Sequence, residues 1–225
     1  MTLAPPSVPS DSLPVATAGH TPSDKLRPFA SVFLIALAVA PGAVVLHELG
    51  HYGSQFPLGY TDVPFISYAS SAMGTAPVDV PFWLADGLTS AAGTVVSLLL
   101  VLAGVAVARH GGPAPLALAL VAFDCVRVLA TLLITGVLDG DSPASGLSDG
   151  FSELAVLPYH LGAMWAAVAV SLVDLAVPLV AAVVVYRALR ARGARTVGAQ
   201  LALSSVGAVT GLALWMGVFG PAVLP

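Results

Sequence analysis

Charged residues are scarce in this sequence: Lys, Arg, Asp and Glu together make up 9% of 225 residues, against about 25% in soluble globular domains. Apolar residues make up 57%, and a chain of this size has no interior large enough to hide them all from water. Eight basic and twelve acidic residues leave no basic patch for nucleic acid. The single cysteine, Cys125, excludes an internal disulfide and a cysteine-only metal site. The composition therefore predicts an integral, multi-pass membrane protein whose solvent is the lipid bilayer.

The apolar residues are gathered into long runs. Residues 1–28 are rich in Pro, Ser and Thr without apolar periodicity, which predicts a flexible tail and not a cleaved signal peptide. Residues 29–225 form the predicted membrane domain, with five stretches long enough to cross the hydrocarbon layer as helices. These predicted spans are 29–49, 82–108, 114–137, 157–186 and 199–221. The fold class that we predict is all-α, with about five transmembrane helices.

Two segments between the spans contain no Lys or Arg, namely 52–80 and 138–156. When five spans alternate, every basic residue except Arg127 falls on the opposite side of the membrane, which predicts a cytosolic N-terminus and an external C-terminus. The two segments then share the outer face. Segment 52–80 alternates polar, aromatic and β-branched residues between glycines, which is typical of a short β-hairpin; an ordinary interfacial loop is the alternative.

The first span ends in His47-Glu48-Leu49-Gly50-His51. Two histidines four residues apart lie on one helix face, so both imidazoles can reach one metal ion. Zn²⁺ suits such a set, because it binds neutral imidazoles and leaves a position open for water. Glu48 is the candidate catalytic base that takes a proton from this water. The structural alternative is a pair of interfacial histidines hydrogen-bonded to carbonyls or water.

A catalytic zinc site normally needs a third protein ligand. The other outer segment supplies carboxylates, and His160 follows just beyond it. The candidates from the residues alone are Asp139, Asp141, Asp149 and Glu153. Most of these carboxylates must be solvated loop groups, and their spacing does not identify the ligand.

The motif His47-Glu48-x-Gly50-His51 at a membrane helix, followed much later by an Asp-Gly pair, resembles the site-2 protease family of intramembrane zinc metalloproteases. The resemblance implies that both histidines and a distant aspartate bind zinc and that Glu48 is the base. Ser148-Asp149-Gly150 is similar to a divergent bacterial branch, which favours Asp149 over Asp139 as the third ligand. It further implies hydrolysis of a membrane protein or peptide substrate in a bacterial cell membrane, with a β-element after the zinc helix pairing with the substrate.

Three charged residues lie inside the apolar spans. Asp124 and Arg127 are i, i+3 neighbours, and Asp174 lies near the middle of the fourth span. Unpaired charges in a membrane are costly, so we expect these residues to face the bundle interior and form a structural salt bridge. A transporter that uses this trio is the alternative function, and a catalytically inactive zinc-binding scaffold is another. Small residues of the second span, including Gly93 and Ser97, predict close helix packing.

Overall fold

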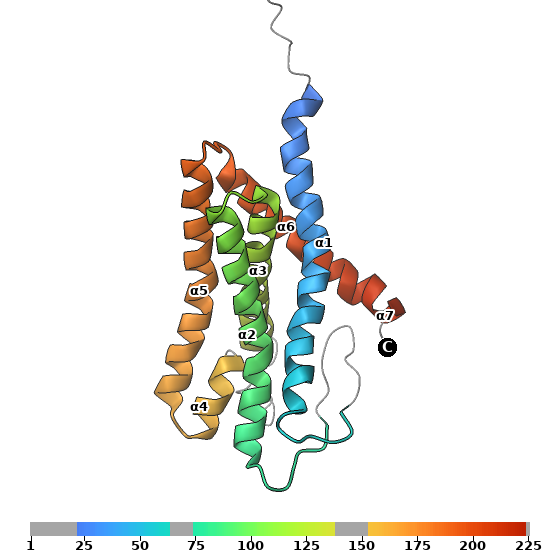
Figure 1. The fold of residues 1–225 in the computed structure, drawn as a ribbon, viewed down its shortest axis with the longest axis vertical. Coiled ribbons are helices and arrows are strands. Elements are labelled where there is room, and N and C mark those ends of the chain that lie inside the picture. The colour runs from blue at the N-terminus through green and yellow to red at the C-terminus, as the bar shows by residue number, and fades with distance from the viewer. Residues whose placement is uncertain (1–21, 64–73, 138–152, 224–225) are drawn as a thin grey trace, which may run out of the picture.

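The computed structural model describes residues 22–63, 74–137 and 153–223, and over these ranges it is an all-helical bundle (Figure 1). The predicted all-α class is therefore confirmed. The long helices are α1 (Pro22–Gln55), α2 (Phe82–Arg109), α3 (Ala114–Val137), α5 (Met164–Ala191) and α6 (Val197–Leu214). The short elements are the 3₁₀ turn η1 (Glu153–Ala155), α4 (Val156–His160), the π-helical turn η2 (Trp215–Phe219) and α7 (Gly220–Val223).

Four helical segments of the described chain are long and apolar enough to cross a membrane. They are Leu26–Gln55, Phe82–Arg109, Met164–Ala191 and Val197–Val223. The helix α3 matches the predicted third span in its bounds, but it is not one of these four, so the count of five spans is not confirmed. The first helix begins at Pro22 and continues to Gln55, and it is therefore longer at both ends than the predicted span 29–49.

The predicted fourth span, 157–186, is divided in the structure. Leu161 caps α4, and Gly162 follows it with a φ of 71°. A left-handed residue directly after a helix is a common stop that glycine adopts without strain. The chain then reverses into α5, which contains Pro178. As a result α4 is a separate short helix between α2 and α5 (Figure 1).

The predicted β-hairpin over 52–80 is not confirmed. The described residues of this segment contain no strand, and a single antiparallel bridge joins Thr61 to Thr75 through N–H···O bonds of 3.0 and 2.7 Å. The fully buried side chain of Gln55 supports the bridge, because its Oε1 accepts a hydrogen bond from the Gly74 N–H at 2.7 Å. Residues 64–73 of the predicted hairpin lie outside the described residues.

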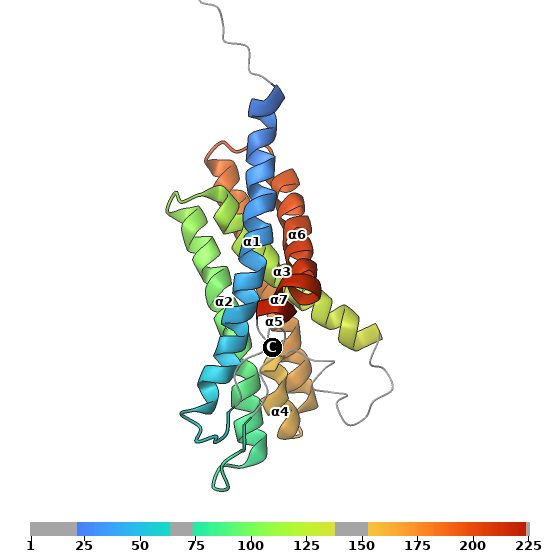
Figure 2. The same ribbon diagram turned by 90° about the vertical axis from the view of Figure 1, so that its right-hand side faces the viewer.

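Close backbone contacts hold the first helix in the bundle, where it packs against α6, α2 and α3 (Figures 1 and 2). A Cβ built on Gly207 of α6 would lie 2.6 Å from the Phe33 carbonyl oxygen, and one built on Gly50 would lie 2.7 Å from that of Ala92. Such contacts matter in lipid, where helices associate chiefly by van der Waals packing. The contact at Gly50 places the segment His47–His51 of α1 directly against α2.

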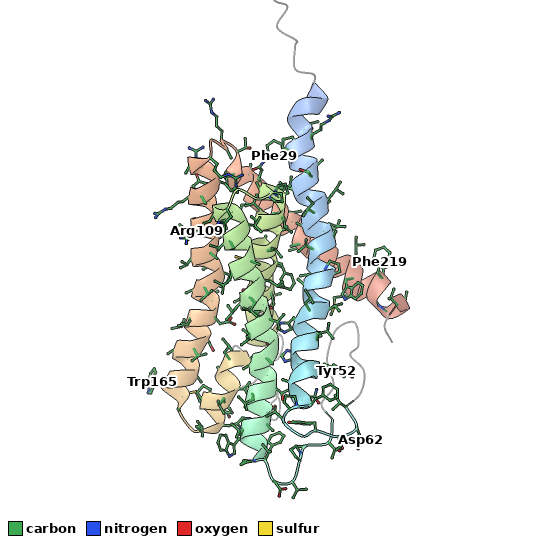
Figure 3. All side chains as sticks on the ribbon, in the orientation of Figure 1. Phe29, Tyr52, Asp62, Arg109, Trp165 and Phe219 are labelled. Carbon is green, nitrogen blue, oxygen red and sulfur yellow. The ribbon has the colours of Figure 1, made fainter. Side chains whose placement is uncertain are left out.

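The basic loops gather at one end of the bundle. The Arg192 guanidinium after α5 donates hydrogen bonds to the carbonyl of Ala108, in the last turn of α2, and to those of Gly111 and Gly112 in the loop before α3. Figure 3 shows Arg109 at this end and Asp62 at the opposite end. The basic loops that follow α2 and α5 therefore lie side by side.

The buried charges pair as the sequence predicts. Arg127 Nε donates to Asp124 Oδ1 at 2.7 Å, and Arg127 Nη2 donates to Asp174 Oδ1 at 3.4 Å. Both carboxylates are buried, at 0% and 3% exposed. The guanidinium of Arg127 thus links α3 to α5 and pairs with both buried carboxylates.

Candidate metal centre

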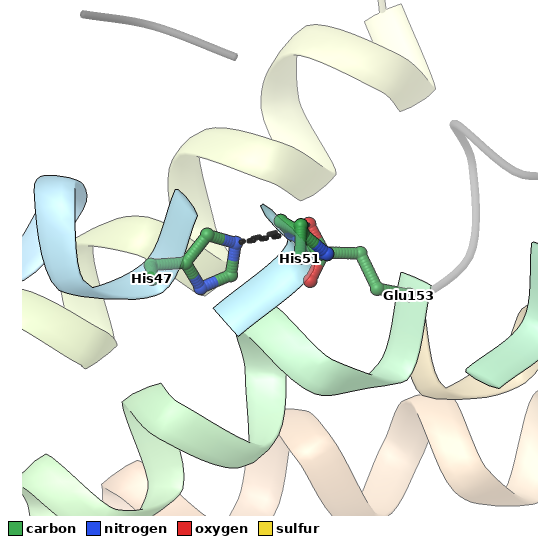
Figure 4. A group of neighbouring side chains, drawn as sticks. All are labelled: His47, His51 and Glu153. Carbon is green, nitrogen blue, oxygen red and sulfur yellow. Dashed lines mark hydrogen bonds and ion pairs between the residues drawn. The ribbon is translucent and has the colours of Figure 1, made fainter. Parts of the chain in front are cut away.

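The centre begins on the last turns of α1, where His47 and His51 lie on one face (Figure 4). Residues four apart in an α-helix lie one above the other, and the two ring centroids are 4.7 Å apart. The Nε2 atoms face one another at 3.1 Å. The predicted pairing of the two histidines is therefore present.

The second helix orients both rings through their Nδ1 atoms. His51 Nδ1 lies 2.8 Å from the Thr89 carbonyl oxygen, and His47 Nδ1 lies 2.9 Å from Ser97 Oγ. Because a carbonyl can only accept, the proton of a neutral His51 ring resides on Nδ1 and Nε2 presents a lone pair. A hydrogen bond to the remote ring nitrogen is the usual support of a metal-binding histidine, since it sets both tautomer and ring orientation.

Glu153, the first residue of η1, is the third member of the group (Figure 4). Its Oε1 lies 3.2 Å from His47 Nε2 and 3.6 Å from His51 Nε2. Its Oε2 accepts a hydrogen bond from Thr94 Oγ1 at 2.5 Å. One carboxylate oxygen is thereby held toward the histidines while the other is anchored on α2.

The protonation state of Glu153 suits a metal ligand. Burial acts to raise the pKa of this carboxyl, but hydrogen bonds and charge interactions with His47 and His51 outweigh it and hold the pKa well below its usual value. The group is therefore ionised at neutral pH, the form in which a carboxylate binds a cation.

The three donor atoms fit a tetrahedral zinc site. Ligands about 2.0–2.1 Å from zinc at tetrahedral angles are about 3.3 Å from one another. The separations here are 3.1, 3.2 and 3.6 Å. Two imidazoles and one carboxylate also form one of the known donor sets of catalytic zinc, in which the fourth position is left for water or substrate. Among the described residues, His47, His51 and Glu153 are the group that could hold a metal ion.

The structure describes one of the four carboxylates that the sequence offers as third ligand. Glu153, one of the four carboxylates named from the sequence, joins the histidines. Asp139, Asp141 and Asp149 lie outside the described residues, so the assignment of Asp149 stays a prediction.

The other two sequence candidates, Glu48 and His160, are not part of this group. Glu48 is half-buried on α1 directly after His47, and its role as base stays a prediction. His160 does not join the group and pairs with Asp86 at 2.7 Å.

The sequence alone did not predict that one face of α2 hydrogen-bonds all three members of the group. Thr89, Gly93 and Ser97 are four residues apart and therefore share a helix face, and Thr94 adjoins it. Gly93 makes room for the His51 ring, because a Cβ there would overlap Nε2 and lie 2.7 Å from Cδ2. As small residues, Gly93 and Ser97 predict helix packing alone. The available signal was the recurrence of a small residue at every fourth position, two of the three with a hydroxyl group, in an otherwise apolar span.

Comparisons of the chain with protein-family models, with curated proteins and with solved structures find no match. The resemblance to site-2 proteases therefore depends on the motif His47-Glu48-x-Gly50-His51 and the later Asp-Gly pair. The function of the protein has to be inferred from the geometry of the metal centre.

Proposed function

We propose that this protein is an intramembrane zinc metalloprotease that hydrolyses a peptide bond in a membrane protein or peptide substrate, in a bacterial cell membrane. The observation that carries the proposal is the convergence of His47 Nε2, His51 Nε2 and Glu153 Oε1 at separations that suit tetrahedral zinc. The two histidines lie on a helix apolar enough to span a membrane, where ionisable side chains generally mark function.

The chain's own residues divide the work of hydrolysis. His47, His51 and Glu153 would hold the metal, and hydrogen bonds with Thr89, Ser97 and Thr94 keep these side chains in place. The chemistry supplied by zinc in this position would be that of a Lewis acid, which polarises a carbonyl and lowers the pKa of water to about 7. Glu48 accepts a proton from the attacking water and returns it to the leaving amine. A helical substrate must first unwind, because its amides are already hydrogen-bonded within the helix.

The test uses purified protein, zinc analysis and a membrane-embedded peptide reporter. Wild type should bind one zinc per chain and cleave the reporter. Glu48→Gln should keep its zinc and cleave about 10²–10⁴-fold more slowly, the usual contribution of a general base. The matched control is Asp62→Asn, an exposed acidic residue beyond the end of α1, which should cleave at the wild-type rate. Cleavage by Glu48→Gln as fast as wild type would show that the base is wrongly assigned.

The same assays separate the alternatives. Zinc binding without cleavage of any peptide would favour an inactive zinc-binding scaffold. A transporter that uses Asp124, Arg127 and Asp174 would lose transport when these are neutralised and tolerate changes at His47. The pairing of both carboxylates with one guanidinium favours a structural role for the trio.

A further inference from the structure

The third ligand is carried by a short segment and not by a long helix. Residues 153–160, here called the ligand arm, comprise η1 and α4 and end at the turn around Gly162. Glu153 is the first residue of the arm and His160 is the last. The position of the Glu153 carboxylate therefore depends on how this arm lies against α2, which it flanks in Figure 1.

Apolar packing fills the middle of this contact. Leu157 of the arm lies directly over Gly87 of α2, where a Cβ would come within 2.7 Å of Leu157 Cβ. Ala155 and Val156 are buried at 0% and 4% exposed. The absence of a side chain at position 87 lets the arm lie flat on α2.

A side-chain hydrogen bond joins the ligand arm to α2 at each of its two ends. At the metal, Thr94 Oγ1 donates to Glu153 Oε2 at 2.5 Å. At the far end, His160 Nε2 lies 2.7 Å from Asp86 Oδ2, next to Gly87. The side chains of this second pair are only 26% and 20% exposed. The arm is thus attached to α2 at two points with an apolar contact between them.

The spacing of the two attachments matches on both partners. Asp86 and Thr94 are eight residues apart, about 12 Å along an α-helix. Glu153 and His160 are seven residues apart, about 11–12 Å through a 3₁₀ turn and an α-helical turn. The arm runs antiparallel to α2, so both polar pairs form at once without stretching either element.

We propose that the hydrogen bond between Asp86 and His160 is a positioning element of the metal centre, which attaches the far end of the ligand arm to α2 and so keeps Glu153 at His47 and His51. The inference rests on the metal centre of the proposed function. The pair contacts no ligand atom and acts only through the arm. Its loss leaves all three ligands in the chain but makes their assembly less favourable.

The experiment measures zinc affinity of the full chain in detergent micelles by competition with a chelator. Asp86→Asn should weaken zinc binding about 10-fold, at the lower end of the range for residues that support metal ligands. In a Glu153→Ala background the same substitution should change the affinity less than about twofold, because the arm no longer delivers a ligand. The matched control is Asp79→Asn, an exposed acidic residue just before α2, with wild-type affinity.

Two further measurements exclude a general loss of structure. Thermal unfolding of the metal-free variants reports folding, and His160→Gln provides the same test if Asp86→Asn does not fold. The Co²⁺ absorption spectrum of Asp86→Asn should shift toward that of Glu153→Ala, a change that a merely structural role would not produce.

The experiment distinguishes failure of the positioning role from failure of the proposed ligand assignment. Wild-type affinity in both Asp86→Asn and His160→Gln would overturn the positioning role, and so would an equal loss with and without Glu153. Wild-type affinity in Glu153→Ala would instead overturn the ligand assignment of the proposed function.

Discussion

Gly93→Ala tests whether the observed geometry of the centre is the functional one. A methyl group at this position would overlap His51 Nε2 and lie 2.5 Å from Cε1, whereas carbon atoms in contact are about 3.5–4.0 Å apart. The ring would therefore have to move by about 1 Å, and metal–ligand distances tolerate only about 0.2 Å. The hydrogen bond from Nδ1 to the Thr89 carbonyl restricts where the ring can go.

We expect zinc affinity to fall about 10- to 100-fold, which corresponds to about 1.4–2.7 kcal/mol. The assay is chelator competition on purified protein, with thermal unfolding of the metal-free chain as the measure of folding. Gly42→Ala is the matched control, because a Cβ at that position of α1 would have nothing within 4 Å. It should leave zinc binding unchanged and stabilise the helix by up to about 1 kcal/mol. Unchanged zinc affinity in a folded Gly93→Ala variant would refute the placement of His51 against α2.

Two other substitutions test the ligand set and the buried charges. Glu153→Ala should lose zinc affinity while Asp149→Ala keeps it, as measured by metal analysis after dialysis; the reverse result would establish the aspartate that the family resemblance implies. Arg127→Met leaves two buried carboxylates without their shared partner and should lower the free energy of unfolding in detergent by about 3–5 kcal/mol. Arg187→Met, at an exposed position of α5, is its control, and equal stability of the two variants would contradict the structural role of the trio.

Several features follow from local sequence and are therefore predictable. Composition alone indicates a lipid environment, because 57% apolar residues exceed what a soluble chain of this length can bury. The spacing of His47 and His51 places them on one face of any α-helix. The pairing of Asp124 with Arg127 is equally local, since i and i+3 are neighbours on a helix surface.

Other expectations are not confirmed, because local pattern does not decide them. The apolar run of 157–186 contains no charge that would mark a break at its start, yet Gly162 adopts a left-handed conformation and separates α4 from α5. Likewise, the alternation in 52–80 is typical of paired strands, but the described residues of that segment form one bridge and no strand.

The sequence by itself indicated a lipid environment, the helical class and the placement of His47 and His51 on one helix face, because these depend on composition and on the period of a single helix. Only the tertiary structure decided that Glu153 joins the histidines, that α2 holds both rings by Thr89 and Ser97, and that a glycine leaves room for one of them. Glu153 lies 106 positions beyond His47 in the sequence. No local rule relates residues so far apart, and their distance is set by which helix faces pack together.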